Sequence, residues 1–373
     1  MKIGIITHYY KSENYGGNLQ AYALCKIVEK MGHSAEQISF DRNKNAKLMR
    51  KIKRAIINLQ RCMSNSFHGI SKNLRTRSKA FYEFNQVVIP HSNNVYSPMS
   101  IANCTNDYDV FITGSDQVWN PQAVCDAYLL KFVTSDKIKM SYAASLSCSE
   151  LDSVQKQRYS DAFFDYSAIS VREEDAVTLV KDLTPLEVKY VLDPVLLIPK
   201  QEWLNVASPI KMSDDYLFCY FLGENPNHRK IAEDYARSHN LKIATLPYLT
   251  GKFHNCDKNF GDVRMYNVSP QNLIALINGA SCIFTDSFHV SAFSLLLEKE
   301  HIIFPRHNSN AMSTRIYSLC SMFGTQDHFC DDNIKQSVDY IETLHPIDYS
   351  TEFSEFERAK ENSYKFLQSI LNK

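Results

Sequence analysis

Residues 280–291, which read ASCIFTDSFHVS, form the stretch that decides the fold. The first half is short, apolar and rich in strand formers, and apolar residues then recur at helical spacing from Val290 to Leu297. Either Asp286 or Ser287 can cap the start of that helix. In open α/β sheets, ligands bind where the carboxyl end of a strand meets a helix N-terminus, whose N–H groups favour anions. His289 therefore either meets a phosphate or carboxylate there, or merely caps and packs the helix.

The same alternation of strands and helices continues on both sides of this stretch and predicts parallel sheets. One series of strands is expected at 2–7, 37–40, 109–113, 139–143, 168–171 and 189–192. A second series is expected at 216–222, 242–246, 281–285 and 301–304. Among the helices, one is expected at 18–31 with Gly32 as its stop, one begins at Ser269-Pro270, and a long amphipathic one spans 353–371.

The predicted fold is an α/β protein with two Rossmann-like domains facing a central cleft, which the carboxyl ends of both sheets line. The length of 373 residues fits two domains of ordinary size. Residues 1–198 are the expected N-terminal domain, with a basic insertion at 42–79, and residues 199–345 are the C-terminal domain. Residues 346–373 are expected to form a helix that packs back across the domains.

Composition and the motifs that the sequence lacks argue against a secreted, membrane-spanning, metal-binding or dinucleotide-binding protein. The sequence begins with a strand, MKIGIIT, which leaves no room for a signal peptide, and no apolar stretch reaches membrane-spanning length. The 10 cysteines are scattered without a CxxC pair or metal-like spacing, as expected for reduced thiols in the cytoplasm. The chain has neither a GxGxxG nor a Walker motif. We therefore predict a cytoplasmic protein with no metal and no cofactor.

Charge is balanced overall but concentrated in one segment. The range 42–79 holds 12 Lys and Arg residues and neither Asp nor Glu, and its apolar residues recur at helical spacing from Leu48 to Leu59. One interpretation is a solvated insertion. The other is peripheral contact with the inner face of the cell membrane, through anionic lipid headgroups or a lipid-diphosphate acceptor. Nucleic acid is not an expected partner, because no recognised binding motif accompanies the charge.

Polar clusters follow three of the expected strands. They read NYGGNLQ at 14–20, TGSDQVWN at 113–120 and REED at 172–175. The pair Gly16-Gly17 lets the backbone approach a ligand closely. A glycine turn or a lone arginine at a strand end is more often structural, so it is the combination that points to a site.

Taken together, these pieces resemble the polysaccharide pyruvyl transferase family. The likeness rests on 14–20, 114–121, SYAAS at 141–145, VRE at 171–173, LDPV at 192–195 and DSFH at 286–289, which occur in the family's order. The resemblance implies two Rossmann-like domains in the GT-B arrangement. It also implies transfer of the carbon skeleton of phosphoenolpyruvate onto two hydroxyls of a sugar, which forms a pyruvate ketal and releases phosphate. Many members act in bacterial capsule, exopolysaccharide or cell-wall polymer assembly.

The chain departs from the family at one position. A branch of the family has Arg-Leu-His where this chain has Ser287-Phe288-His289, and that arginine contacts the donor. Ser287 cannot supply the charge, so another cation must do so, or the activity differs. Arg315, just ahead of a helical run, is the first candidate, and Arg306-His307 is the second. The alternative for Arg315 is a salt bridge between the lobes.

The chemistry of ketal formation suggests roles for the donor-side residues. Phosphoenolpyruvate carries a phosphate and a carboxylate, so its site needs cations and helix N–H donors. Arg172 and Arg315 are the expected clamps, with Ser287 and Arg306 also at the donor. Protonation of the methylene carbon needs an acid, and histidine is the natural choice. His289 is therefore the expected general acid or phosphate ligand.

A carboxylate base is expected to help the attacking sugar hydroxyl. Asp116 is the first candidate. The alternative role for Asp116 is to hold its loop by bonding backbone N–H groups, as aspartates in turns commonly do. Asp286, beside His289, could equally be the base. The residues expected to bind the acceptor, with the tryptophan ring stacking on a sugar face, are Gly17, Asn18, Gln20, Gln117 and Trp119.

Two other functions stay open. A GT-B glycosyltransferase that uses a nucleotide sugar would have the same fold, but it would need a base and ribose pocket in the second lobe, of which the sequence shows no clear sign. A non-catalytic scaffold for polysaccharide assembly is the other. Ser287 in place of arginine favours the scaffold weakly, whereas converging cations and His289 argue against it.

Overall fold

The computed structural model describes residues 1–373 except 45–70, 250–252, 307–309, 333 and 373. The chain divides into two compact units. The N-terminal unit comprises Met1–Ile52, Glu83–Ile198 and Glu357–Lys373, and the C-terminal unit comprises Lys53–Tyr82 and Pro199–Phe356. Both units contain parallel sheets flanked by helices, which confirms the predicted α/β class. Most of the basic segment 42–79 lies outside the described residues.

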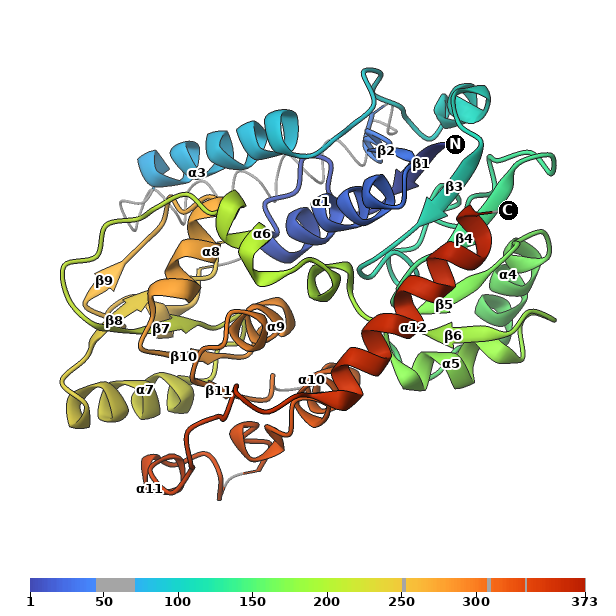
Figure 1. Ribbon diagram of the computed structural model, residues 1–373. Helices are drawn as coiled ribbons and strands as arrows, with labels where there is room; N and C mark the ends of the chain where they lie inside the picture. Colours follow the sequence, from blue (N-terminus) through green and yellow to red (C-terminus); the bar gives the residue numbers. More distant parts are fainter. Residues whose placement is uncertain (45–70, 250–252, 307–309, 333, 373) are drawn as a thin grey trace. The chain divides into compact units, whose positions relative to one another are not determined.

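The N-terminal unit is built on a parallel sheet in the order β2-β1-β3-β4 (Figure 1). Its strands are β1 (Lys2–Ile6), β2 (Ser34–Gln37), β3 (Val110–Thr113) and β4 (Ile138–Ser141). Bridges from Met140 to Ala168 and from Ala144 to Val171 link β4 to a further parallel pair, β5 (Ile169–Val171) and β6 (Val188–Tyr190). Every residue of β3 is buried, as expected for a central parallel strand covered on both faces.

Helix α1 (Tyr15–Lys30) begins three residues before the predicted start. The two glycines at its start are poor helix formers, so the sequence pattern did not indicate the first turn of this helix. The Asn14 side chain accepts a hydrogen bond from the Gly17 N–H at 3.2 Å and caps the helix in their place. Gly32, with φ of +86°, follows the end of the helix as predicted. The other helices of this unit are α4 (Ser153–Phe163) and α5 (Glu174–Lys181), with shorter helical turns η1 (Phe84–Val88), η2 (Ile101–Asp107) and η3 (Pro194–Leu197).

Strand β2 lies earlier in the chain than the predicted strand at 37–40. The apolar run that suggested this strand is buried, but it leaves the sheet after Gln37. It pairs instead with the segment that follows η1, through bridges from Gln37 to His91 and from Phe40 to Tyr96. The prediction was wrong here because burial by a neighbouring loop gives the same apolar pattern as burial in a sheet.

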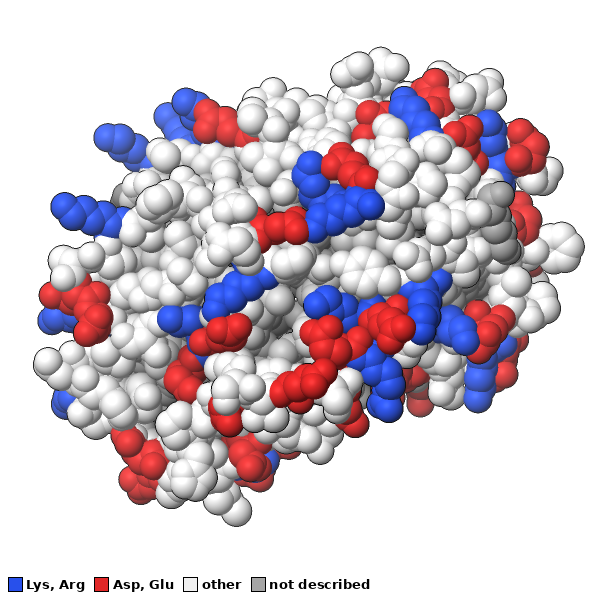
Figure 2. Space-filling view, viewed as in Figure 1, with Lys and Arg blue, Asp and Glu red and all other residues white. Residues whose placement is uncertain are grey.

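The long C-terminal helix α12 (Ser354–Leu371) joins the N-terminal unit from Glu357 onward. The Ser363 hydroxyl accepts a hydrogen bond from the Leu192 N–H at 2.9 Å, and the Tyr364 hydroxyl donates to the Leu197 carbonyl at 2.6 Å. Its outer face carries mixed charges, including the pair Lys365–Glu361 at 2.6 Å (Figure 2). No helix within the described ranges is long and apolar enough to cross a membrane.

The C-terminal unit has a parallel sheet in the order β11-β10-β7-β8-β9. Its strands are β7 (Tyr216–Tyr220), β8 (Lys242–Thr245), β9 (Val263–Arg264), β10 (Cys282–Thr285) and β11 (His301–Ile303). Its helices are α3 (Ser71–Glu83), α6 (Lys200–Val206), α7 (Pro226–Ser238), α8 (Pro270–Gly279), α9 (Phe288–Leu296), α10 (Asn310–Met322) and α11 (Val338–Ile341), with turns η4 (Asn255–Asp257) and η5 (Gln326–His328). Ser269 caps α8 ahead of Pro270, as predicted.

A buried histidine in this unit predicts a specific acid sensitivity. His301 is fully buried, and burial lowers its pKa to about 4. Below pH 6.5 this histidine is therefore protonated in the unfolded chain but stays neutral in the folded unit. The free energy of unfolding consequently falls as the pH drops from 6.5 towards 4. The expected loss from this group is about 3 kcal/mol, at about 1.4 kcal/mol per pH unit.

Urea unfolding measures this loss. In a Trp119→Phe background, Trp203 reports on the C-terminal unit alone. The His301→Asn variant should lose less stability than the parent between about pH 7 and about pH 4.5. His345→Asn, at an exposed histidine of the same unit, should behave like the parent. Equal losses in the parent and in His301→Asn would show that another group causes the acid sensitivity.

Candidate functional site

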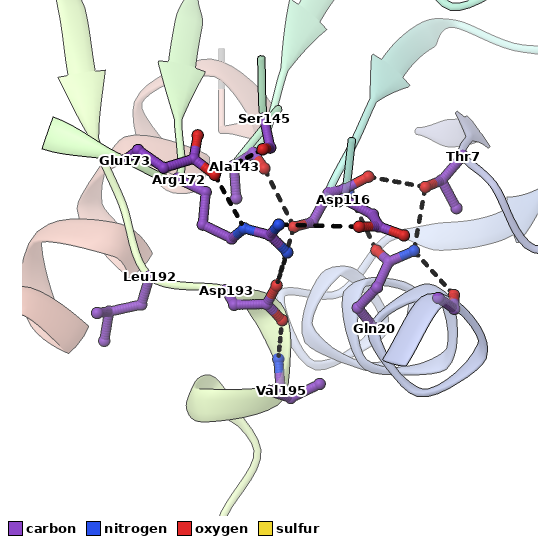
Figure 3. Close-up of polar contacts among 12 residues, drawn as sticks. Thr7, Gln20, Asp116, Ala143, Ser145, Arg172, Glu173, Leu192, Asp193 and Val195 are labelled. Carbon is purple, nitrogen blue, oxygen red and sulfur yellow. Dashed lines mark hydrogen bonds and ion pairs between the residues drawn. The ribbon is translucent and has the colours of Figure 1, made fainter. Parts of the chain in front are cut away.

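In the N-terminal unit, polar side chains gather where β1, β3 and β5 end. Thr7 and His8 follow β1, Ser115 and Asp116 follow β3, and Arg172 follows β5. These strands run parallel, so their carboxyl ends meet at one edge. The motifs after these strands therefore lie at one edge of this unit's sheet, and Figure 3 shows their contacts.

Arg172 lies at the centre of this group. Its guanidinium is only 3% exposed and pairs with Asp193 at 2.7 Å, Glu173 at 3.6 Å and Asp116 at 3.7 Å (Figure 3). Burial alone would disfavour its charge, but the three carboxylates outweigh that effect and raise the pKa of Arg172.

The surroundings of Arg172 give it partners within the fold, and its role as a donor clamp stays a prediction. Three carboxylates face this guanidinium, so it has no surplus positive charge for an anionic donor. An incoming phosphate would meet the carboxylates as well. Arg172 is the cation that pairs with Asp116, Glu173 and Asp193 in this unit.

Gln20 and Asn18, predicted to bind the acceptor, use their side chains within the fold. Both are fully buried. The Gln20 amide donates to the Thr7 hydroxyl at 3.0 Å and accepts from the Ser115 N–H at 3.1 Å. The Asn18 amide donates to the carbonyls of Asn14 at 2.7 Å and Ser12 at 3.0 Å. These two residues shape the loops at the strand ends and do not face a sugar.

Trp119 is also part of the core. Its side chain has no exposed surface, its ring lies 4.6 Å from that of Phe163, and its indole N–H donates to the Tyr128 carbonyl at 3.1 Å. The predicted stacking on a sugar therefore lacks an accessible ring face. The sequence motif was right about the loop but wrong about this side chain, because a tryptophan pattern does not tell which face of the loop it occupies. Gln117 in the same loop is partly exposed.

Asp116 has φ of +70° and sits in a loop that its own backbone helps to hold. Its carbonyl accepts hydrogen bonds from the N–H groups of Val118 at 2.8 Å and Ser145 at 2.9 Å. Its carboxylate pairs with Arg172 and is 12% exposed. Gly17 packs closely against this carboxylate. A Cβ added at Gly17 would lie 3.4 Å from the Asp116 carboxylate and 3.1 Å from the His8 carbonyl. These loop contacts come from the Asp116 backbone and not from its carboxylate, so the side chain's predicted loop role and its predicted catalytic role both stay predictions.

His8 belongs to this group, and sequence reasoning missed it. Its ring packs edge-on against Tyr128 at 4.5 Å, and its Nε2 is buried without a hydrogen-bond partner among the described residues. Burial lowers the pKa of His8, although the nearby Asp116 carboxylate opposes the shift. A neutral imidazole at neutral pH can accept a proton. The signal in the sequence was its position, directly after the first buried strand.

In the C-terminal unit, Asp286 follows β10 and makes hydrogen bonds to the backbone that follows β7. It is fully buried, and its carboxylate oxygens accept from the N–H groups of Leu222 at 2.6 Å and Gly223 at 2.8 Å. Burial raises the pKa of Asp286, with Arg306 and the two N–H groups opposing the shift. Asp286 was predicted as an alternative base; the structure gives it this structural role instead. Gly223, which the sequence analysis did not single out, allows the approach, since a Cβ there would lie 3.0 Å from the carboxylate.

Cations surround the junction between β10 and α9. Arg306 donates to the Asp286 carbonyl at 3.1 Å while its side chain remains 25% exposed. The guanidinium of Arg315 lies 5.9 Å from the centre of the Phe288 ring. His289 is in the first turn of α9 and is partly exposed, and Ser287 gives this helix end no side-chain cap. The structure thus brings together His289, Ser287, Arg306 and Arg315, whereas His307 lies outside the described residues.

No group of three His, Cys, Asp or Glu side chains that could hold a metal ion occurs in the described part of the chain. The groups at the β10–α9 junction are two arginines, a histidine and a helix N-terminus, with the buried Asp286 carboxylate 4.0 Å from Arg306. This combination suits an anion such as a phosphate or a carboxylate.

Comparisons with known proteins agree with the fold and give a family. The model of the family described as polysaccharide pyruvyl transferase matches residues 14–308. No curated protein sequence matches the chain. A solved structure of UDP-GlcNAc 2-epimerase from Methanocaldococcus jannaschii is similar, with a TM-score of 0.58, 12% identity, and coverage of 99% of this chain and 100% of that chain.

Two more solved structures show the same likeness. The S. aureus MnaA–UDP co-structure has a TM-score of 0.51, 10% identity, and coverage of 100% of this chain and 98% of that chain. UDP-GlcNAc 2-epimerase from Neisseria meningitidis bound to UDP-GlcNAc has a TM-score of 0.50, 11% identity, and coverage of 99% and 100%. At such identities the likeness concerns the fold alone, and it confirms the predicted GT-B-like class.

Proposed function

Since the chain belongs to the polysaccharide pyruvyl transferase family, we propose that it transfers the pyruvyl group of phosphoenolpyruvate onto two hydroxyls of one sugar. The products are a pyruvate ketal and inorganic phosphate. The observation that carries this proposal is the β10–α9 junction, where Arg306, Arg315 and His289 accompany a helix N-terminus.

The donor has the charges that this junction suits. Phosphoenolpyruvate carries a phosphate and a carboxylate, and both anions gain from arginine N–H donors and from the positive end of a helix dipole. Arg306 and Arg315 supply the charge that Ser287 lacks. Arg306 is the stronger candidate for direct contact because a quarter of its side chain is exposed, whereas Arg315 is 5% exposed.

The reaction needs proton transfers but no oxidant or reductant. His289 gives a proton to the methylene carbon of the donor, and the first sugar hydroxyl adds to the carbon that bears the phosphate while losing its own proton to a base. The second hydroxyl then displaces phosphate and closes the ring, and its proton leaves with the phosphate. Protonation by a positioned side chain contributes about 10²–10⁴ in rate in such reactions.

The N-terminal unit supplies two groups able to accept the hydroxyl proton. The Asp116 carboxylate lies 3.7 Å from the Arg172 guanidinium, and burial lowers the pKa of His8, which favours a neutral imidazole. We propose Asp116 as the base, with His8 as the group beside it. The acceptor is proposed to be a unit of a bacterial capsular or exopolysaccharide, carried on a lipid diphosphate at the cytoplasmic face of the membrane, which the basic segment 42–79 would contact.

Titration of phosphoenolpyruvate into the protein without acceptor tests the donor site. Arg306→Ala should weaken binding about tenfold to a hundredfold, because a charge-assisted hydrogen bond contributes about 1.5–3 kcal/mol. Arg237→Ala is the matched control, since Arg237 is exposed in the same unit and pairs with Asp234 on α7. Its binding should equal that of the parent.

Other outcomes would redirect the proposal. Unchanged affinity in Arg306→Ala would remove this arginine from the donor site. Failure of the parent to bind phosphoenolpyruvate, together with binding of UDP-GlcNAc, would favour a nucleotide-sugar enzyme, as in the neighbours bound to that ligand. If phosphoenolpyruvate binds, phosphate release with methyl glycosides of galactose, mannose, glucose and their N-acetylated amines identifies the acceptor.

A further inference from the structure

The C-terminal unit contains a cavity of about 630 Å³ that the donor site does not use. Its walls come from the segment between the end of α10 and the start of α12. This volume lies within the range of about 300–1,000 Å³ that is typical of small-molecule sites.

The cavity lies at the other edge of the sheet from the β10–α9 junction. The segments that form its walls make hydrogen bonds to residues just before β11 and to the first residue of β11. The Ile347 N–H donates to the Glu300 carboxylate at 2.8 Å, the Tyr349 hydroxyl donates to the Lys299 carbonyl at 2.9 Å, and His328 contacts the His301 carbonyl at 3.0 Å. The junction follows the end of β10, which is parallel to β11. The start and the end of parallel strands lie at opposite edges, so the cavity and the donor site are distinct.

His328 presents a hydrogen-bond acceptor at the cavity. The residue lines the cavity and is 8% exposed. Its Nδ1 lies 3.0 Å from the His301 carbonyl, and a carbonyl can only accept, so Nδ1 carries the proton. In the tautomer with the proton on Nδ1, Nε2 is the acceptor of the ring and can bind the hydroxyl of a ligand.

Asp327 offers a second acceptor beside His328. Within the described ranges, its exposed carboxylate has no hydrogen bond or ion pair, while its carbonyl accepts from the Tyr340 hydroxyl at 3.1 Å. Asp348, also in the wall, differs because its carboxylate already accepts from Ser350 and Thr351. Asp327 and His328 are therefore the acceptors available to a ligand.

The rest of the wall excludes anions and offers apolar faces. None of the described wall residues is Lys or Arg. A phosphate or carboxylate would meet the carboxylates of Asp327 and Asp348, and the described part of the wall has no permanently charged Lys or Arg to balance them. Partly exposed rings of Tyr340 and Phe353 provide apolar surface.

We propose that this cavity binds a neutral sugar unit of a saccharide. A sugar has hydroxyls that donate to a carboxylate and an imidazole, and C–H faces that pack on aromatic rings. The site is separate from the donor site and would hold a saccharide whether or not that site accepts phosphoenolpyruvate.

Saturation-transfer NMR tests this proposal with maltotriose, chitotriose, lactose and methyl galactoside as probes. We expect at least one of them to bind. Asp327→Ala and His328→Gln should each weaken that binding about tenfold, as expected for hydrogen bonds to charged or desolvated groups. Asp339→Ala is the matched control, because Asp339 is exposed on α11 outside the wall. Galactose 6-phosphate should bind more weakly than methyl galactoside.

Three results would overturn the proposal. One is that none of the probes binds. Another is that a probe binds equally well to Asp327→Ala, His328→Gln and the parent, which places it elsewhere. The third is that Arg306→Ala, at the donor site, abolishes binding while both cavity variants retain it. Since Asp327→Ala alters an exposed residue, it keeps the test valid even where His328→Gln fails to fold.

Discussion

Arg172→Ala is expected to destabilise the N-terminal unit severely. The change removes a cation that is 3% exposed and leaves the carboxylates of Asp116, Glu173 and Asp193 without it. Breaking a buried ion pair by removing one partner costs about 3–5 kcal/mol. For a unit of this size, the melting temperature should fall by roughly 6–20 °C, measured by scanning calorimetry.

The pH dependence of this loss separates electrostatics from lost packing. Without Arg172, three carboxylates face one another with no cation between them, and uptake of a proton relieves their repulsion. The folded variant then binds more protons than the unfolded chain, so its stability recovers as the pH falls. The difference in melting temperature from the parent should therefore be smaller at about pH 5 than at about pH 8.

Arg158→Ala is the matched control for this experiment. Arg158 is in the same unit, but it is 37% exposed and pairs with Asp126 at the surface, where a salt bridge contributes little. A melting temperature unchanged in Arg172→Ala, with binding of phosphoenolpyruvate lost, would restore Arg172 to the donor site.

The sequence predicted the class of fold because runs of apolar residues and the spacing between them are local features of the sequence. The fully buried strands β3 and β10 and the capped start of α8 are visible in the residue order alone. The start of α1 and the position of β2 were missed for a common reason. In both cases a contact outside the regular pattern decided the structure. The Asn14 side chain caps the start of α1, and the Gln37–Phe40 run pairs with the segment near His91 instead of continuing β2.

The same logic explains which site residues were predicted well. A residue at a strand end is placed at the sheet's edge by local order, so the motifs around Asp116, Arg172 and His289 were found. Which partner each side chain takes depends on residues distant in the sequence. Arg172 meets Asp193, 21 positions away, and Asp286 meets Gly223, 63 positions away. Such partners give Arg172 and Asp286 structural contacts that no local pattern signals.

His289→Ala is expected to lower kcat for pyruvyl transfer by about 10²–10⁴, the range for loss of a general acid. His289 lies in the first turn of α9, beside the arginines proposed to hold the donor anions. Since Arg306 remains, binding of phosphoenolpyruvate should weaken much less than turnover. Phosphate release with the acceptor chosen by the glycoside screen gives kcat, and titration without acceptor gives the donor affinity.

The split between these two measurements distinguishes the acid from a mere phosphate ligand. A ligand would lose donor affinity while retaining turnover once the donor is saturating, because its contact is made equally in the ground state and the transition state. An acid would lose turnover at every donor concentration. His239→Ala controls for the loss of an imidazole, since His239 is an exposed residue at the end of α7 and contacts Glu342. Turnover in His289→Ala within about threefold of that control would assign the methylene proton to another donor, since a general acid contributes about 10²–10⁴.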